Sequence, residues 1–171
     1  EDKIMKKSIL IELLSKFSIK ETKEFSEYIS SPFFNKNQSI IKLYSYLKLQ
    51  YPLFEKENIE KKAVFQRIFP NVKYNDGFMR TLIFGLCTLA ENYLSYTRYK
   101  SSYFRDKTFL LYELNDRQVD RLLEKNIKSF SKKLDSVVIK DNEYYYDKYN
   151  LENEKYLFYF RKKPDAFEKI I

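Results

Sequence analysis

The stretch NDGFMRTLIFGLCTLAENYLSYTRYK, residues 75–100, decides the fold class of this chain. Its apolar residues recur every three or four positions, which is the period of one face of an α-helix. Asn75 and Asp76 stand before the run and are residue types that accept hydrogen bonds from the free amides of a helix N-terminus. We therefore predict one long helix, which we expect to be the central one. Its apolar stripe comprises Met79, Leu82, Ile83, Leu86, Leu89, Ala90, Tyr93 and Leu94.

Helical periodicity continues over nearly the whole chain of 171 residues. Only two glycines and four prolines are present, whereas sheet proteins need glycine for tight hairpins and bulges. We therefore predict an all-α fold of seven to eight antiparallel helices, stacked as an open helical array or an irregular bundle. Residues 1–171 are expected to form a single helical domain. Besides the central helix, the predicted helices cover about residues 3–16, 18–31, 37–51, 58–68, 102–114, 116–134 and 141–163.

Several residues mark the ends of these predicted helices. Ser18 and Glu21 form the S-x-x-E capping box, in which each side chain satisfies a free backbone N–H of the other residue. Prolines end helices because the residue before a proline is pushed out of helical geometry. The prolines that end the second, third and fourth helices are Pro32, Pro52 and Pro70. The candidates for the N-caps of the third and seventh helices are Asn35 or Asn37, and Asn115 or Asp116.

The stretch SSPFFNKN, residues 30–37, places Phe33 and Phe34 between the end of one predicted helix and the start of the next. Two interpretations are open. The two rings fill the space between crossing helices, or they form an exposed binding hot spot. Large aromatic residues in a tight turn of an apolar domain are more often core residues, so we predict that both rings are buried.

The residue types on which most enzymes depend are scarce in this sequence. No histidine is present, which excludes imidazole bases, Ser-His-Asp triads and His-ligated metals within these residues. The single cysteine, Cys87, excludes a Cys-rich zinc site and an intrachain disulfide, and we expect it to be a buried, inert thiol. Gly77 and Gly85 are the only glycines, so a glycine-rich phosphate loop is absent. We expect no enzymatic activity and no cofactor.

The net charge of +8 is spread along the chain. The surplus of basic residues is +5 before Gly85 and +3 after it, so no basic block exists. Spread charge of this kind is typical of a solvated surface. Carboxylates at helical spacing have basic neighbours and indicate a mixed, solvated face, which comprises Asp116, Asp120 and Glu124 with Arg117, Arg121 and Lys125.

The segment EYYYDKYNLENEKYLFYF, residues 143–160, is the candidate functional surface. On a helix its apolar residues cover most of the circumference near the end, so we expect burial on more than one side. The functional interpretation is an aromatic surface that grips a protein or stacks on nucleic-acid bases. Stacking platforms pair aromatic residues with a basic groove, and the lysines here are offset by Glu143, Asp147, Glu152 and Glu154. The candidate interaction residues are Tyr145, Tyr149, Tyr156, Tyr159 and Phe160.

Two functional hypotheses follow from these patterns. The first is a non-enzymatic helical interaction or scaffold module, whose partner is a protein or further helices of the same chain. The alternative is a nucleic-acid-binding helical domain that uses a basic surface and the Tyr-rich helix. A DNA-reading helix-turn-helix over residues 59–86 is not favoured, because its second helix is mainly apolar. Its only candidate base-reading residues are Lys73, Asn75, Arg80 and Thr81.

The longest nearly apolar run, residues 81–90, is far shorter than the ~20 residues that a membrane-spanning helix requires. The opening EDKIMKKS lacks the pattern of a secretion signal. We therefore expect no membrane association and a cytoplasmic location. Near the end, Pro164 stops one helix and Asp165 can cap another, so we expect the sequence to be a fragment of a longer protein.

Two longer stretches carry a resemblance. The run FSIKETKEFSEYISSPFFNKNQSIIKLYSYLK, residues 17–48, is followed by IFPNVKYNDGFMRTLIFGL, residues 68–86. With the S-P-F-F-N-K-N corner and the I-F-P…Y-N-D junction, they resemble the N-terminal part of a group of uncharacterised bacterial proteins, which are long, rich in lysine and tyrosine, and mostly helical. The resemblance implies an all-α fold and a longer parent chain, and it implies no activity and no site residues.

Overall fold

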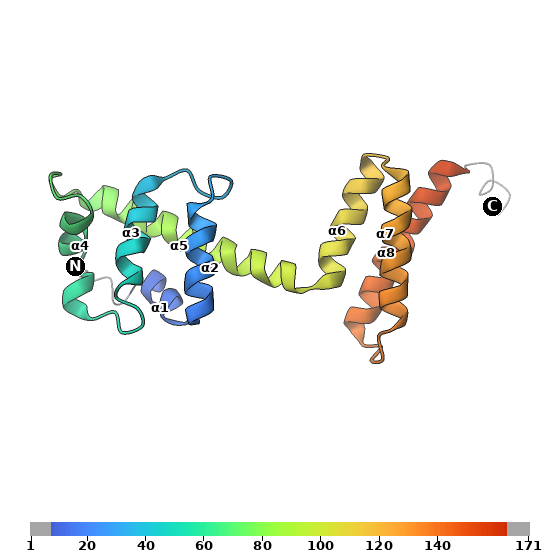
Figure 1. Ribbon diagram of the computed structural model, residues 1–171, viewed down its shortest axis with the longest axis horizontal. Coiled ribbons are helices and arrows are strands. Elements are labelled where there is room, and N and C mark those ends of the chain that lie inside the picture. The colour runs from blue at the N-terminus through green and yellow to red at the C-terminus, as the bar shows by residue number, and fades with distance from the viewer. Residues whose placement is uncertain (1–7, 164–171) are drawn as a thin grey trace. The chain divides into compact units, whose positions relative to one another are not determined.

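The computed structural model describes residues 8–163, and this part of the chain forms eight α-helices and one 3-10 helix without any β-strand (Figure 1). The predicted all-α fold class is confirmed. The chain divides into two compact units, unit 1 up to Tyr96 and unit 2 from Thr97, so the boundary lies inside helix α5, Asp76–Ser101. We expected a single domain over residues 1–171. The structure differs because the buried apolar residues gather in two separate clusters, one in each unit.

Unit 1 buries the apolar faces that the periodicity predicts. Phe25, Leu43, Phe65 and Leu86 are fully buried in one cluster. The predicted fourth helix is divided in two, and the predicted start of the first helix near residue 3 lies outside the described residues. The helices of this unit are α1 Ile9–Ser15, α2 Ile19–Ser30, α3 Gln38–Lys48, the 3-10 helix η2 Lys56–Ile59, α4 Lys61–Ile68 and most of α5.

The predicted caps of α2 and α3 are present. The backbone N–H of Ser18 donates to Oε2 of Glu21 over 2.7 Å, and the N–H of Glu21 donates to Oγ of Ser18 over 3.1 Å. The capping box is therefore confirmed, and hydrogen bonds from Ser18, first of all from its backbone N–H, hold the pKa of the Glu21 carboxyl below its ordinary value. Of the two candidates for α3, Asn37 is the N-cap, since its side chain accepts from the N–H of Ser39 over 2.9 Å.

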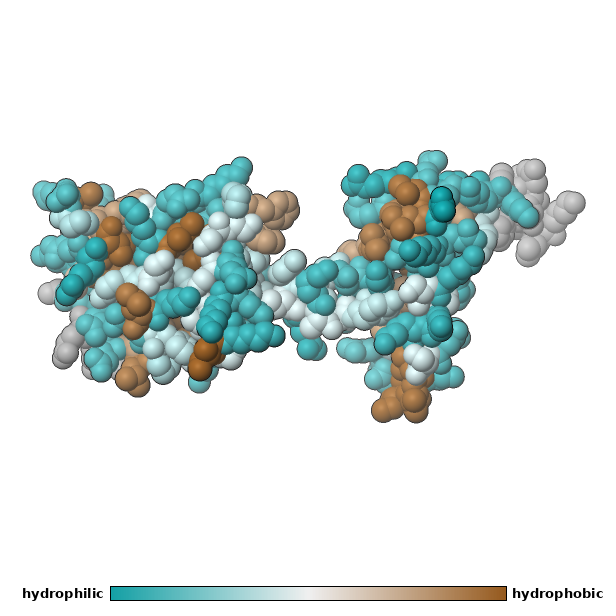
Figure 2. Space-filling view, viewed as in Figure 1, coloured by the Kyte–Doolittle hydropathy of each residue, from teal (hydrophilic) through white to brown (hydrophobic). Residues whose placement is uncertain are grey.

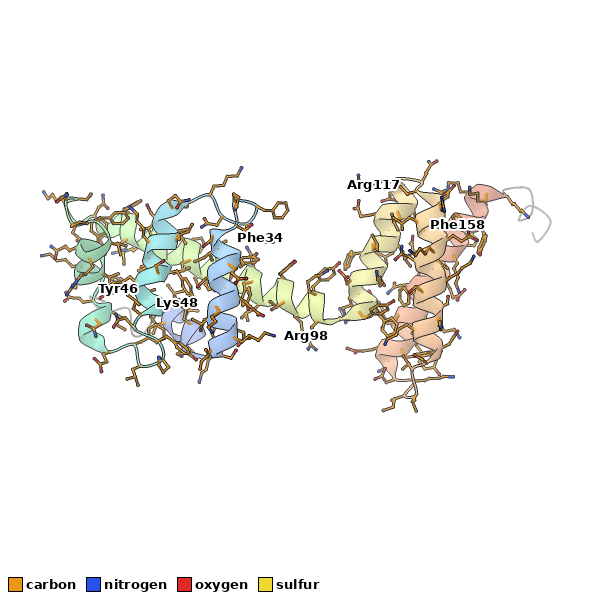
Figure 3. All side chains as sticks on the ribbon, viewed as in Figure 1. Phe34, Tyr46, Lys48, Arg98, Arg117 and Phe158 are labelled. Carbon is orange, nitrogen blue, oxygen red and sulfur yellow. The ribbon has the colours of Figure 1, made fainter. Side chains whose placement is uncertain are left out.

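The corner between α2 and α3 corrects one prediction. Phe33 is 86% exposed, so its predicted burial is wrong. Phe34, labelled in Figure 3, is half-buried and stacks on Tyr28 with 4.1 Å between the ring centroids. The buried Asn35 stabilises the turn with two hydrogen bonds. Its Nδ2 donates to the carbonyl of Ile29 over 2.9 Å, and its Oδ1 accepts from the backbone N–H of Asn37. The turn is thus built on Asn35 and Phe34 rather than on both rings.

Gly85 lies where α5 passes close to α3. A methyl group added at Gly85 would lie 2.8 Å from Cδ1 of Ile40, which is closer than carbon atoms approach in folded proteins. A helix-interior glycine costs about 1 kcal/mol relative to alanine. An alanine at this position would require the end of the Ile40 side chain to shift.

Unit 2 consists of the end of α5 and three helices that pack on one another (Figure 1). A prediction for this unit is wrong: neither Asn115 nor Asp116 caps α7, because α6 continues through both residues and α7 follows Val119. Asn115 is instead buried and serves the interior of the unit. The helices are α6 Tyr103–Asp116, α7 Asp120–Asp135 and α8 Asn142–Lys162, and their buried apolar side chains include Leu111, Leu123, Ile127, Phe130, Leu151 and Phe158.

Exposed apolar side chains are also found away from the helix faces. On the face of unit 1 that Figure 2 shows, they are separated by polar residues, which is normal for a protein surface. In unit 2, Val138 and Ile139 are exposed in the link between α7 and α8, which falls between the predicted helices 116–134 and 141–163. Figure 2 shows apolar residues gathered at this end of the unit.

Replacing each corner phenylalanine in turn tests this assignment. We expect Phe33→Ala to change the free energy of unfolding by less than about 0.5 kcal/mol, because the ring is already in solvent. Phe34→Ala removes the stack on Tyr28 and is expected to destabilise unit 1 by roughly 1–2 kcal/mol. Urea denaturation followed by circular dichroism measures both values. Equal losses in the two variants would contradict the assignment.

Candidate functional site

Helix α8 packs on its neighbours with a partly polar face. Among its buried residues are Asp147, Asn150 and Glu154, alongside the apolar Leu151 and Phe158. These three polar side chains lie on the side that meets α6, where their hydrogen-bond and charge partners are found. The sequence predicted that α8 is buried on more than one side. Within the described residues it is packed on one side only, against α6 and α7, and that side carries the polar residues.

The buried polar groups are joined by hydrogen bonds to α6. Nδ2 of Asn115 donates to Oε2 of Glu154 over 2.9 Å, and Glu154 is only 3% exposed. One turn earlier along α8, the hydroxyl of Tyr112 donates to Oδ1 of Asn150 over 3.3 Å. A buried carboxylate or amide is tolerated when such partners are present, and it is costly without them. The two bonds therefore fix how α8 is rotated about its own axis.

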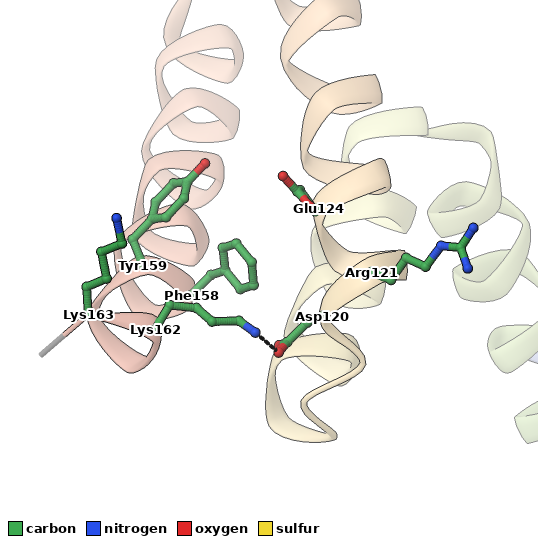
Figure 4. A pocket seen from close by; sticks show the side chains of 7 residues that line it. All are labelled: Asp120, Arg121, Glu124, Phe158, Tyr159, Lys162 and Lys163. Carbon is green, nitrogen blue, oxygen red and sulfur yellow. Dashed lines mark ion pairs between the residues drawn. The ribbon is translucent and has the colours of Figure 1, made fainter.

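The C-terminal end of α8 is tied to the start of α7. Arg161 donates from Nη1 to the carbonyl of Asn115 over 2.8 Å and from Nη2 to Oδ1 of Asp120 over 2.5 Å. Lys162 forms an ion pair with the same carboxylate (Figure 4). The hydrogen bond from Lys162 holds the pKa of Asp120 below its ordinary value, with help from the charge of Arg161.

An open pocket lies between these ends of α7 and α8 (Figure 4). Its wall combines the aromatic rings of Phe158 and Tyr159 with charged side chains of both signs, such as Glu124 and Lys163. The carboxylate of Asp120 is already engaged by two cations of α8. The pocket therefore has no unpaired pair of carboxylates that would serve as an acid and a base.

The packing of its polar face leaves most aromatic residues of α8 at the surface, and only Tyr144 and Phe158 are buried. The five candidate interaction residues are all exposed, although we expected much of this helix to be covered. Tyr156 and Phe160 stack on each other with 5.8 Å between centroids. The exposed fractions are 58% for Tyr145, 68% for Tyr149, 50% for Tyr156, 51% for Tyr159 and 44% for Phe160. Tyr146 and Leu157, which we did not select as candidates, are exposed beside them.

A second surface was missed in the sequence. The residues expected to form a mixed face at the start of α7 separate in the structure, because Asp120 turns to α8 while Arg117 pairs with Glu113. The solvent side of α7 then carries a row of exposed basic residues, which are Arg121, Lys125, Lys128 and Lys132. Their spacing of four, three and four residues is a signal that could have been found, since it places all four on one helix face.

The single thiol and the possible metal ligands were the other chemically active groups of interest. Burial raises the pKa of the Cys87 thiol, and the nearby Glu91 adds to the shift, so the thiol is further from the reactive thiolate form. Within residues 8–163, no three side chains of His, Cys, Asp or Glu are grouped so that they could hold a metal ion. In the same part of the chain, no helix is both long and apolar enough to cross a membrane.

The buried Asn115–Glu154 pair can be tested with a double-mutant cycle. Asn115→Leu leaves the carboxylate of Glu154 without its side-chain donor on α6, and we expect a loss of about 2–4 kcal/mol in the stability of unit 2. The second substitution, Glu154→Leu, removes the unpaired carboxylate from the interior and should restore most of the lost stability of unit 2. Thermal and urea unfolding of the single and double variants measures the coupling. Additive losses would show that the two side chains do not depend on each other.

Asp147 gives the fold a pH dependence of unusual sign. Burial raises the pKa of this carboxyl above its ordinary value, and the charge of Arg105 opposes the shift only in part. The folded state therefore retains a proton that the unfolded state loses, so stability is greatest below the ordinary pKa and falls as the pH rises. We expect Asp147→Asn to raise the melting temperature at about pH 7 and to have little effect near pH 3. A lower melting temperature of the variant at neutral pH would contradict this.

Comparison with known proteins gave no match: no family model matches the sequence, and no curated protein or solved structure matches the chain at a significant level. The function therefore has to be inferred from the geometry of the molecule itself.

Proposed function

We propose that this chain is a non-enzymatic interaction module, and that α8 of unit 2 docks an amphipathic helix of a protein partner. The observation that supports this function is the inverted packing of α8. Its interior face contains Asp147, Asn150 and Glu154 beside a few apolar side chains, whereas five of its six tyrosines are exposed and only Tyr144 is buried. Large exposed groups of aromatic residues are typical of protein–protein contacts, where tyrosine is enriched. The cytoplasmic location expected from the sequence remains part of this proposal.

The spacing of the exposed side chains favours a helix as the occupant. Tyr145, Tyr149, Glu152, Tyr156 and Tyr159 follow one another at intervals of four, three, four and three residues, and all are exposed. This alternation places the five side chains along one stripe of α8, which we call the seam. It is the pattern by which two helices pack along their lengths. An extended peptide or a flat sheet would not match a seam of this period.

The charges beside the seam indicate the chemistry of the partner helix. Lys148, Lys155 and Lys162 are spaced by seven residues and therefore lie along one edge of the seam. The acidic residues Asp147 and Glu154, which offset these lysines in the sequence, are turned into the interior, while Lys155 and Lys162 keep ion pairs with Glu152 and Asp120. A partner helix with glutamates at its flanking positions would complement this edge, because such flanking charges set the choice and orientation of partners in paired helices.

One polar residue within the seam restricts how a partner helix can align with α8. Glu152 occupies the middle of the seam and forms a 2.8 Å ion pair with Lys155 at its edge. Covering this carboxylate with an apolar side chain would cost free energy, since a buried charge needs a partner. The partner helix is therefore expected to place a lysine or arginine opposite Glu152. A single polar position of this kind fixes the alignment of paired helices.

A designed peptide provides the test of this function. The probe is an amphipathic helix of about three heptads with leucine and isoleucine on its seam, one central lysine and glutamates at the flanking positions. We expect saturable binding in fluorescence anisotropy, and a loss of more than about tenfold in affinity for the double variant Tyr145→Ser/Tyr149→Ser, since exposed tyrosines are the expected anchors.

Two controls make the outcome specific. The variant Phe84→Ser removes an aromatic ring that is 74% exposed on α5 in unit 1, and it should leave the affinity unchanged. A second peptide with the same seam and lysines at the flanking positions should bind more weakly. Equal binding of both peptides, or loss of binding in the Phe84 variant, would overturn the proposal. So would self-association of the chain through the same tyrosines in sedimentation velocity, because the occupant would then be a second copy.

A further inference from the structure

Helix α7 separates apolar and basic residues between its two sides. Its inner side carries the buried residues Leu123, Ile127, Phe130 and Leu134. Its outer side carries the basic row defined above, and all four side chains of the row are exposed. From Arg121 to Lys132 the row extends for about 16 Å along the helix, at a rise of about 1.5 Å per residue.

Few ion pairs neutralise this row, although Glu124 and the exposed Asp135 lie on the same side of α7. Within residues 8–163, Lys128 pairs with Glu124 over 3.4 Å, and no ion pair engages Arg121, Lys125 or Lys132. The carboxylate of Asp120 is occupied on the other side of the helix by Arg161 and Lys162 of α8. Figure 4 shows the Arg121 side chain pointing away from Asp120 and Lys162. The row therefore presents its positive charge to the solvent.

An aromatic ring and two further lysines lie beside the row, where α6 meets α7. The hydroxyl of Tyr103 is 3.3 Å from Oγ of Ser129, so the ring reaches the side of α7. Nζ of Lys107 lies 6.0 Å from the centroid of this ring and Nζ of Lys133 lies 5.8 Å from it. Tyr103 is 37% exposed. A basic row next to an accessible ring is the combination that binds the backbone and a base of a single strand.

We propose that the outer face of α7, with Tyr103 beside it, binds single-stranded nucleic acid. The four basic side chains of the row contact successive phosphates, and binding is driven by the release of counterions from the strand. Tyr103 stacks on one unpaired base, which a duplex does not offer. Without base-edge contacts, the surface binds strands of different sequence with similar affinity.

The structure favours this partner over an anionic membrane. A helix that lies on a lipid surface must insert an apolar face into the headgroup region. The apolar face of α7 is occupied by the core of unit 2, and on its outer side only Leu122 is a partly exposed large apolar residue. An acidic protein would also complement the charge of the row, but it has no unpaired base to stack on the ring of Tyr103.

This inference does not depend on the helix-docking function of α8. The two surfaces use different residues on different helices, and they are expected to respond oppositely to salt. Contact with phosphates weakens steeply as the salt concentration rises, whereas packing on a mainly aromatic seam depends on it far less. Loss of one activity in a variant of the other surface would show that the two sites are not separate.

The test measures binding of the whole chain to a fluorescent single-stranded oligonucleotide of mixed sequence at low and at moderate salt. The row variant carries Arg121→Ala, Lys125→Ala, Lys128→Ala and Lys132→Ala, which favour helix and should leave the circular dichroism spectrum unchanged. We expect its affinity at low salt to fall by more than about tenfold and its logarithmic salt slope to decrease by about 3, at roughly 0.7 per lost phosphate contact. Tyr103→Leu should weaken binding of the single strand and leave binding of the duplex unchanged.

The matched control removes the same charge from unit 1, through alanine substitutions of the exposed Lys23, Lys36, Lys62 and Lys73. Equal losses in the two variants would show that only the net charge matters, and would overturn the proposal. Tighter binding of phosphatidylserine vesicles or of polyglutamate than of the oligonucleotide, abolished in the row variant, would assign the face to a membrane or to an acidic protein instead. Absence of oligonucleotide binding at low salt would also overturn it.

Discussion

The hydrogen bond from Asn115 to Glu154 is the interaction on which the surface of unit 2 depends. A glutamate that is 3% exposed is stable only where a donor meets it, and Nδ2 of Asn115 at 2.9 Å is that donor. With Glu154 held against α6, α8 has one allowed rotation about its axis. Tyr145 and Tyr149 lie on the opposite side of the helix and must then face outward. The exposed aromatic seam is thus a consequence of a polar contact in the interior.

The same contact determines which charges remain at the surface. Glu154 and Asp147 leave the solvent when α8 packs, and Asp120 is neutralised by Arg161 and Lys162. With Asp147 and Glu154 in the interior and Asp120 paired with α8, Arg121 and Lys125 of α7 form no ion pair among the described residues. A sequence whose charges look evenly mixed therefore folds into a unit with a basic outer face. Net charge along the chain is a poor guide to charge on a surface for this reason.

In unit 1 the buried polar groups stabilise turns, whereas in unit 2 they lie at the interface between α6 and α8. Asn35 is buried at the corner after α2 and hydrogen-bonds to the carbonyl of Ile29, which leaves Phe34 to stack on Tyr28. The capping box of Ser18 and Glu21 sets where α2 begins, and Gly85 of α5 lies against the side chain of Ile40 in α3. These are local constraints, and they explain why this unit follows the sequence pattern closely.

The sequence by itself determined the helices, because periodicity, caps and prolines act over a few residues. The stripe of α5, the Ser18–Glu21 box and the extent of α8 were all predicted from such local signals and are confirmed. Only the tertiary structure decided which face of a helix is inside. Phe33 is exposed and Asn115 is buried against the prediction, because burial depends on partners distant in the sequence. The same holds for the aromatic seam of α8 and the basic row of α7, whose exposure depends on which neighbouring helix satisfies each polar group.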